Sequence, residues 1–330
     1  MKKKNKIFIV AEAGNNHEGS FLVAKKLVDA ASKAGADAIK FQTIDVKKFI
    51  SKTNKIRFEL LKKFSLTLND FKKLSLYCKK KKIIFFSFVF FLNSVNYLNK
   101  IQNYFKISSG DNNFYDLIKK VAKLNKELII STGGADLDQI VKIYNIVKNI
   151  RKRKKLQLSF LHCVSSYPAE LDQINLLSII ALKNKFPDVN IGFSDHTSEI
   201  NTSVHAVLVG AKIIEKHFTL DNNFSSFRDH KIALNPKNFK EMVNRINEAT
   251  ITMGKEEKVV QKSEKKILIT MRRSAHIKNA IVKGAKLNKT NIIFLRPGNG
   301  ITNENIRMYY GKKVNKNINA GKMLNKKNFY

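Results

Sequence analysis

The sequence predicts a (β/α)8 barrel followed by a small β-rich domain. Apolar runs of strand length alternate with amphipathic runs of helix length about eight times over roughly 245 residues, as is typical of this barrel. Nearly every polar residue inside the predicted strands lies at a C-terminal strand end, the edge on which barrel enzymes build their active sites. After Met253 the chain becomes polar, and short runs separated by turn residues follow.

The individual elements follow from local signals. Each predicted strand is rich in Ile, Val or Phe and stops at a polar residue or a glycine, whereas each predicted helix has apolar residues along one side. The strands are expected at residues 6–13, 36–43, 82–87, 104–111, 126–132, 156–163, 189–194 and 212–218. The helices are expected at 20–35, 68–80, 93–101, 114–125, 136–150, 175–186, 199–210 and 236–250, with Gly35 ending the first and Pro236 beginning the last. The basic stretch before residue 68 is expected to be a loop.

The polar residues at the strand ends are the candidate functional residues. One serine or threonine in such a place is explained as a cap of the following helix, but capping leaves the lysines and histidines unexplained. The set consists of Glu12, Lys40, Gln42, Ser87, Lys106, Ser108, Ser109, Ser131, Thr132, His162, Asp195, His196, Glu215 and His217.

His196 and His217 stand at matched positions, each at the end of one of two successive strands and each beside a carboxylate, Asp195 or Glu215. The strands of a βαβ unit lie parallel, so both imidazoles would face one opening. A single histidine here would be interpreted as a buried, hydrogen-bonded residue. Two at matched strand ends favour a divalent-metal site.

The formal charge of +36 suggests nucleic acid or an anionic membrane as a partner, but the composition argues against both. Arg accounts for nine of the 62 basic residues, whereas proteins that read nucleic acid use Arg heavily. The lysines are scattered over predicted helix faces. We therefore expect general surface basicity, with steering of anionic substrates, and no nucleic-acid partner.

The remaining composition points to a cytoplasmic enzyme. Cys78 and Cys163 form no CxxC pattern, so neither a disulfide nor a zinc knuckle is expected. The N-terminus has a basic start, but its apolar run, IFIVA, is too short for a signal peptide. No window approaches the length of a membrane span, so no membrane partner is expected.

The predicted strand-end groups suggest a reaction class. Lysines, hydroxyls and helix N-termini at a barrel mouth suit a phosphate or a carboxylate. A metal held by two histidines polarises a carbonyl, and Glu12 and Glu215 are placed to orient or deprotonate a water or a sugar hydroxyl. Together these features suggest condensation of a phosphorylated carboxylate donor with an aldehyde.

Nine motifs in order, over almost the whole chain, resemble the sialic acid synthase family, whose members make N-acetylneuraminate, legionaminate or pseudaminate. The terminal part is similar to the antifreeze-like (SAF) domain of that family. The resemblance implies a catalytic barrel at 1–250, a linker at 251–266 and an SAF domain at 267–330. The motifs are FIVAEAGNNHEG, GADAIKFQT, FKISSGD, LIISTGGA, FLHCVSSYP, IGFSDHT, IIEKHFTLD, RDHK and RPGNG.

The resemblance implies that the enzyme condenses phosphoenolpyruvate with the open-chain form of an N-acylated mannosamine-type sugar, giving a nine-carbon 2-keto acid and phosphate. His196 and His217 would hold the metal, usually Mn²⁺, with Mg²⁺ or Co²⁺ as alternatives. It would activate the sugar aldehyde for attack by C3 of phosphoenolpyruvate. Water would then add at C2, and the tetrahedral intermediate would lose phosphate.

The resemblance also assigns roles to individual residues. The phosphoenolpyruvate-binding positions match Lys40, Lys106, Ser109, Ser131 and Ser194. The catalytic positions match Glu12, Glu215 and Asp229, and the sugar-binding positions match Gln42, Tyr167 and Arg296. Arg296 matches an arginine that the SAF domain inserts into the partner's barrel, which implies a homodimer with exchanged domains.

The chain departs from the family pattern after the third strand. Family members usually carry Ser-Thr-Pro-Phe-Asp, whereas this chain has Ser87, Phe88, Val89, Phe90 and Phe91. A threonine hydroxyl near the phosphate is thus replaced by a ring, which leaves the third-strand exit either remodelled or less active. The stretch Val164–Ser166 also departs from the pattern and implies altered sugar contacts.

Within the family, the run Asp229-His230-Lys231 favours a neuraminate or legionaminate synthase, with pseudaminate synthase as the alternative. A first rival is another phosphoenolpyruvate-using aldol-type synthase, but a phosphorylated acceptor would need an Arg cluster, and this barrel has few Arg. A second rival is a catalytically impaired barrel, disabled at Phe88, that binds polyanions.

Overall fold

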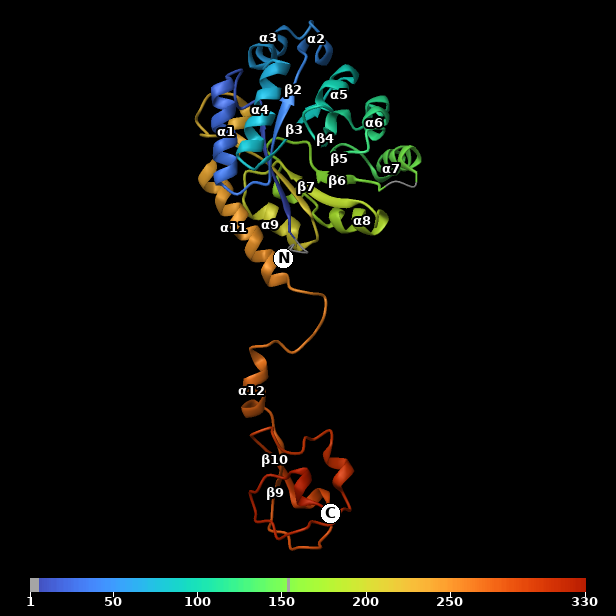
Figure 1. The fold of residues 1–330 in the computed structure, drawn as a ribbon, viewed down its shortest axis with the longest axis vertical. Helices are drawn as coiled ribbons and strands as arrows, with labels where there is room; N and C mark the ends of the chain where they lie inside the picture. Colours follow the sequence, from blue (N-terminus) through green and yellow to red (C-terminus); the bar gives the residue numbers. More distant parts are fainter. Residues whose placement is uncertain (1–5, 153–154) are drawn as a thin grey trace. The chain divides into compact units, whose positions relative to one another are not determined.

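The computed structural model describes residues 6–152 and 155–330, so the basic start at residues 1–5 lies outside the described residues. Eight parallel strands close into a barrel in sequence order, with β8 pairing back onto β1 (Figure 1). The predicted (β/α)8 fold is confirmed. The strands are β1 (Phe8–Gly14), β2 (Ala38–Thr43), β3 (Ile84–Val89), β4 (Tyr104–Ile107), β5 (Glu127–Ser131), β6 (Leu158–Cys163), β7 (Asn190–Asp195) and β8 (Ile213–His217).

Helices cover the outside of the barrel, and local signals fix where several of them begin. The Ser20 hydroxyl accepts a hydrogen bond from the Val23 amide at the start of the first helix, and Thr67 with Asp70 forms a capping box at the start of α4. The helices that follow the strands are α1 (Phe21–Lys33), α4 (Leu68–Lys80), α5 (Leu92–Leu98), α6 (Tyr115–Ala122), α7 (Leu137–Arg151), α8 (Leu177–Lys185), α9 (Asn201–Leu208) and α11 (Pro236–Met253).

The barrel interior is built in layers, because every second residue of a strand points inward. One apolar layer consists of Val10, Ala38, Phe86, Ile129, Leu161 and Ile213. Two residues further along the same strands, the next layer is mostly polar and consists of Glu12, Lys40, Phe88, Ser131, Cys163 and Glu215. The change from an apolar to a polar layer places the reactive groups at the C-terminal end of the barrel.

The stretch expected to be a basic loop after β2 is partly helical, so that prediction was wrong for α2 (Val46–Phe49) and α3 (Lys55–Phe64). Leu61 and Phe64, three residues apart on α3, are both buried, and Leu61 packs in an apolar cluster with Phe88. The many lysines in this stretch lie on the exposed side and obscure the helical spacing of the apolar residues. The short helix α10 (Arg228–Ile232) was also not predicted.

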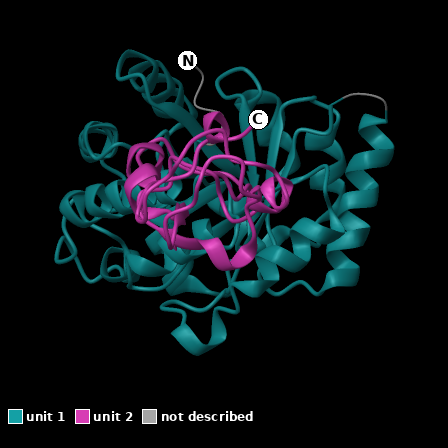
Figure 2. Cartoon of the chain, turned by 90° about the horizontal axis from the view of Figure 1, so that it is seen from below, with its two compact units in different colours: residues 1–254 teal, residues 255–330 magenta. Residues whose placement is uncertain are grey.

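Residues 255–330 form a second compact unit (Figure 2). It contains α12 (Glu264–Met271) and two antiparallel strands, β9 (Ser274–Ile277) and β10 (Ile292–Leu295), around an apolar cluster of its own. The other β pairing in this unit consists of isolated bridges, so its β structure is less regular than expected. The expected linker, 251–266, begins inside α11 and ends inside α12. The SAF assignment stays a prediction.

No helix within the described residues is both long enough and apolar enough to cross a bilayer.

Candidate active site

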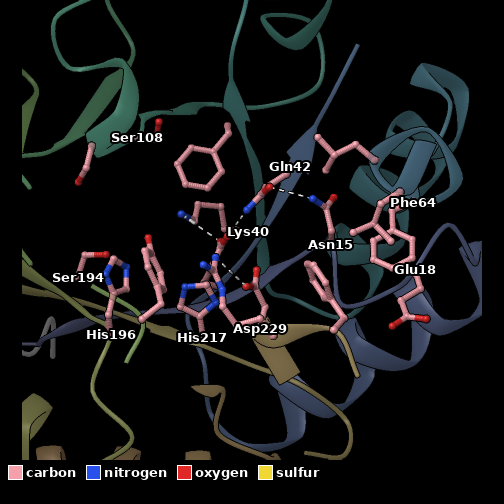
Figure 3. A pocket seen from close by; sticks show the side chains of 18 of the residues that line it. Asn15, Glu18, Lys40, Gln42, Phe64, Ser108, Ser194, His196, His217 and Asp229 are labelled. Carbon is pink, nitrogen blue, oxygen red and sulfur yellow. Dashed lines mark hydrogen bonds and ion pairs between the residues drawn. The ribbon is translucent and has the colours of Figure 1, made fainter. Parts of the chain in front are cut away.

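A cavity of about 770 Å³ opens at the C-terminal ends of the barrel strands (Figure 3). All the residues to which the family resemblance assigns a role, except Arg296, line it. They are Glu12, Lys40, Gln42, Lys106, Ser109, Ser131, Tyr167, Ser194, His196, Glu215, His217 and Asp229. Arg296 is exposed on the second unit, so its contact with a partner's barrel stays a prediction.

Glu215 is the centre of a buried charge network on the cavity floor. Both of its carboxylate oxygens lie 2.8 Å from Lys106 Nζ, and its Oε1 lies 2.9 Å from Lys40 Nζ. Lys40 Nζ also lies 3.0 Å from Glu12 Oε2, and the Ser194 hydroxyl donates to Glu215 Oε1 at 3.0 Å. Two ammonium groups and two carboxyl groups therefore share one water-poor site.

The surroundings shift the pKa values of the two acids of this network in opposite directions. Burial, together with the neighbouring Glu215 charge, raises the pKa of Glu12 to about 7, although Lys40 opposes the shift. Burial acts to raise the pKa of Glu215 as well, but Lys106 and Lys40 outweigh it and hold that pKa far below its usual value. Burial lowers the pKa of Lys106 to about 8, against the pull of Glu215. Glu12 is therefore the carboxyl group that can take up or release a proton near neutral pH.

His196 and His217 lie close together beside this network, with ring centroids 5.5 Å apart. The Tyr167 ring stacks on His196 at 4.1 Å and meets His217 edge-on at 5.9 Å. His196 Nδ1 donates to the Val164 carbonyl at 2.7 Å, so its Nε2 carries the free lone pair. Burial, with the neighbouring His196 and Lys40 charges, lowers the pKa of His217 well below its ordinary value and keeps this ring neutral.

The two imidazoles lie close enough to bind one divalent cation as a pair of nitrogen ligands. His217 Nδ1 is buried and has no hydrogen-bond partner among the described residues, as expected for an atom that awaits a ligand. In residues 6–152 and 155–330 no three His, Cys, Asp or Glu side chains gather around a common point. Oxygen atoms of water or substrate would have to complete the coordination of any ion held here.

A buried ion pair behind the cavity fixes the loop that carries His196. Asp195 and Lys216 alternate with the two histidines along β7 and β8, so their side chains point out of the barrel, and Lys216 Nζ lies 3.0 Å from Asp195 Oδ2. Lys216 also donates to the carbonyls of Thr197 at 2.6 Å and Glu199 at 2.9 Å. The pair therefore holds the backbone on both sides of His196 in one conformation.

Asp229 lies on α10 and also lines the cavity. It is buried, and burial raises its pKa while the adjacent Arg228 guanidinium opposes the shift. The next residue, His230, faces away from the cavity, with Nδ1 2.6 Å from Thr219 Oγ1 and Nε2 3.3 Å from Glu18 Oε1. This contact fastens α10 to the turn after β1 and so positions Asp229.

Several strand-end residues in the predicted set have structural roles. The Ser87 hydroxyl bonds to Thr43 Oγ1 at 2.6 Å, Thr132 Oγ1 donates to the Leu161 carbonyl at 3.1 Å, and His162 Nε2 donates to the Ile174 carbonyl at 2.6 Å. None of these side chains, nor that of Asp195, lines the cavity. The expectation that functional residues lie at C-terminal strand ends located the correct edge of the barrel. It also included residues that face outward or into loops.

Sequence reasoning missed one whole wall of the cavity. Asn15 and Glu18 come from the GNNHEG turn, and the Asn15 amide donates to Gln42 Oε1 at 2.9 Å (Figure 3). A largely apolar group comes from α2, α3 and the segment before α10, namely Phe49, Arg57, Leu60, Leu61, Lys63, Phe64 and Phe227. The polar residues of the turn after β1 were a usable signal for Asn15 and Glu18. No local signal indicated that α3 would fold over the cavity.

Comparisons with known proteins identify relatives of this chain. The model of the NeuB family matches residues 27–258. The chain is 39% identical to the N,N'-diacetyllegionaminic acid synthase of Campylobacter jejuni over 97% of this chain and 99% of that protein. It is 33% identical to the pseudaminic acid synthase of the same organism, over 98% and 97%.

Solved structures show the same relationship. The N-acetylneuraminic acid synthetase of Leptospira borgpetersenii, solved in complex with citrate, superposes with a TM-score of 0.75 at 33% identity, over 80% of this chain and 90% of that one. The family match covers most of the barrel, and the two Campylobacter relatives cover nearly the whole chain. The chain belongs to the NeuB family of sialic, legionaminic and pseudaminic acid synthases, and it is an enzyme of the transferase class.

Proposed function

We propose that this enzyme condenses phosphoenolpyruvate with the aldehyde form of an N-acylated amino sugar, giving a nine-carbon 2-keto acid and inorganic phosphate. The observation that carries the proposal is the buried network of Lys40, Lys106, Glu215 and Glu12 beside two histidines at the barrel mouth. Cations, hydroxyls and a carboxyl group that titrates near neutral pH are what an anionic donor and a water molecule require in one site.

Phosphoenolpyruvate, the donor, would lie on the side of the cavity that carries the lysines. Lys40 and Lys106 would balance the donor's charge, and the hydroxyls of Ser109, Ser131 and Ser194 line the same region. The Ser131 hydroxyl is buried and has no hydrogen-bond partner among the described residues, so it is free to donate to a phosphate or carboxylate oxygen.

His196 and His217 would hold a divalent cation, which we propose to be Mn²⁺, with Mg²⁺ or Co²⁺ as alternatives. When bound, such an ion acts as a Lewis acid toward a carbonyl oxygen. The chain's own contribution is to keep the His217 ring neutral and to fix the position of the His196 ring. Tyr167 stacks on His196, and the Asp195–Lys216 pair holds the loop on either side of it.

The proton balance of the reaction gives Glu12 a role. C3 of phosphoenolpyruvate forms a bond to the aldehyde carbon, whose oxygen becomes an alkoxide and needs a proton. Water adds at C2 and must lose one proton. The resulting tetrahedral centre then expels phosphate and becomes the ketone as its hydroxyl proton passes to the leaving phosphate. Glu12, with its pKa raised to about 7, is suited to take the proton from water and return it to the alkoxide.

The amino sugar, the acceptor, would lie against the cavity wall that includes α3. Gln42, Asn15 and Asp229 supply polar contacts, whereas Leu60, Leu61, Phe64 and Phe227 are apolar. Apolar side chains suit methyl groups, so this wall supports an acceptor with two N-acyl groups and a deoxy carbon over N-acetylmannosamine. We therefore propose N,N'-diacetyllegionaminate as the product, ahead of N-acetylneuraminate. Pseudaminate is the alternative product, and the same lining suits it equally.

The test is release of phosphate from phosphoenolpyruvate with Mn²⁺ and one of three acceptors: N-acetylmannosamine, the diacetylated precursor of legionaminate, or that of pseudaminate. We expect chelator-sensitive release, fastest with the legionaminate precursor, and loss of release in His217→Ala. Faster release with the pseudaminate precursor would reverse the choice of product. Absence of release with all three, from folded protein, would refute the proposed function.

A further inference from the structure

Phe88 is an aromatic residue in the otherwise polar layer of the barrel interior. It lies on β3 between the two strands that carry the donor-side lysines, and strand pairing aligns its Cα with those of Gln42 on β2 and Lys106 on β4. Its side chain is buried and lines the cavity. The register of three adjacent strands thus places an aromatic ring among the ammonium groups.

The ring contacts both lysines through its π face. Lys40 Nζ lies 3.5 Å from the ring centroid and Lys106 Nζ lies 5.4 Å from it, both within the range of a cation–π interaction. Lys40 Nζ is buried, and although two carboxylates lie near it, it makes no hydrogen bond of good geometry within the described residues. The ring is therefore one of three groups that determine where this ammonium stays.

We propose that Phe88 is a positioning residue that holds Lys40, and more weakly Lys106, in place to bind the anionic donor. This inference rests on the proposed function, because it takes phosphoenolpyruvate as the anion. The negative face of the ring attracts the ammonium without neutralising it, whereas its bulk excludes water from the space between the lysines. The ring thereby replaces the hydroxyl expected at this position, and the site is adapted rather than disabled.

Fluorination of the ring tests this proposal at nearly constant shape. Each added fluorine draws negative charge from the π face, so a series with mono-, di- and trifluorophenylalanine at position 88 weakens the cation–π contact in steps. With each step, we expect a lower melting temperature and a weaker affinity for phosphoenolpyruvate. Because a Lys40 that is held less firmly must be ordered further on binding, the dissociation constant should rise about three- to tenfold at the trifluoro step. An unchanged dissociation constant across the series would overturn the proposal.

Phe86 provides a matched control. It lies two residues earlier on the same strand and also points into the barrel, where its ring packs 5.8 Å from Tyr104, and no cation lies over it in the described part of the chain. The same fluorinated series at position 86 should leave the affinity for phosphoenolpyruvate unchanged. A rise at position 86 equal to that at 88 would mean that fluorination acts through packing, and this would also contradict the proposal.

Phe88→Thr tests whether the phenylalanine supports or impairs donor binding, because this substitution restores the hydroxyl and removes the ring. We expect Phe88→Thr to raise the KM for phosphoenolpyruvate more than that for the acceptor, whereas Phe88→Tyr retains near-normal values. Tighter binding or faster turnover in Phe88→Thr would show that the phenylalanine is a lesion. If the unmodified protein neither binds nor consumes phosphoenolpyruvate, the proposed function fails, but the melting temperatures of the series still report whether the ring holds Lys40.

Discussion

The buried ion pair between Asp195 and Lys216 makes a measurable prediction about stability. In Lys216→Met the ammonium is lost while the aliphatic stem is kept, so Asp195 loses its counter-charge and the carbonyls of Thr197 and Glu199 lose their donor. Removing one partner of a buried pair destabilises a protein by about 3–5 kcal/mol. Asp195 keeps hydrogen bonds from the Thr197 amide at 2.9 Å, the Thr197 hydroxyl at 2.8 Å and the Ser203 hydroxyl at 2.6 Å. We therefore expect a loss near the lower limit, about 3 kcal/mol.

The assay is the unfolding transition of the barrel, followed by heat and by denaturant. For a domain of this size, about 3 kcal/mol corresponds to a decrease in Tm of roughly 6–12 °C. Lys212→Met is the control, because Lys212 precedes β8, is exposed and forms none of the ion pairs found among the described residues. It should change the free energy of unfolding by less than about 0.5 kcal/mol.

A double variant checks that the effect comes from the pair itself. Lys216→Met with Asp195→Asn removes both charges, so its loss of stability should be clearly smaller than the sum of the two single losses. The reasoning is refuted if Lys216→Met costs less than about 1 kcal/mol, or if the single losses add. Because the pair fixes the loop around His196, we also expect the folded Lys216→Met protein to bind Mn²⁺ more weakly than Lys212→Met does.

Three further predictions concern the site. Glu12 must be deprotonated to accept a proton and Lys106 must be protonated to bind the donor, so kcat/KM should rise as the pH passes about 7 and fall as it passes about 8. A pH–rate profile checks this, and Lys106→Arg should move the falling limb to higher pH without moving the rising one. A chelator should abolish phosphate release, and Mn²⁺ should restore it in the unmodified protein but not in His217→Ala; metal-independent turnover would contradict the two-histidine site. If Arg296 reaches a partner's barrel, Arg296→Ala should raise the acceptor KM without altering dimer mass, as measured by kinetics and light scattering; normal kinetics would count against the exchanged dimer.

The sequence was sufficient for the barrel, because the relevant signals are local. Alternation of apolar strand runs with amphipathic helix runs depends on residues a few positions apart, and so does the change to polar residues at each strand end. Glu12, Lys40, Lys106, Glu215 and His217 were found in this way, and the structure brings all five into one cavity.

The sequence could not decide which strand-end residues face the cavity. Strands of this barrel are buried on both faces, so polar residues on either face give the same pattern. Asp195 and His196 are neighbours in the sequence, as are Lys216 and His217, and only the closed sheet shows that the histidines point inward and the ion pair outward. The same limit explains why Ser87, Thr132 and His162 were included in the predicted set.

Tertiary structure alone decided the contacts between distant segments. The burial of α3 over the cavity depends on β3, because Leu61 finds its apolar partners around Phe88, and the lysines of that helix concealed the pattern. The place of Phe88 between Lys40 and Lys106 depends on the register of three strands that are separated by helices and loops. The sequence by itself determined the eight strands, the helices that follow them and the edge of the barrel that carries the chemistry. Barrel closure determined the buried charge network, the Asp195–Lys216 pair that supports the His196 loop, and the contact of Phe88 with the lysines. Each of these joins side chains from different strands, and the local periodicity of a sequence does not show which strands are neighbours.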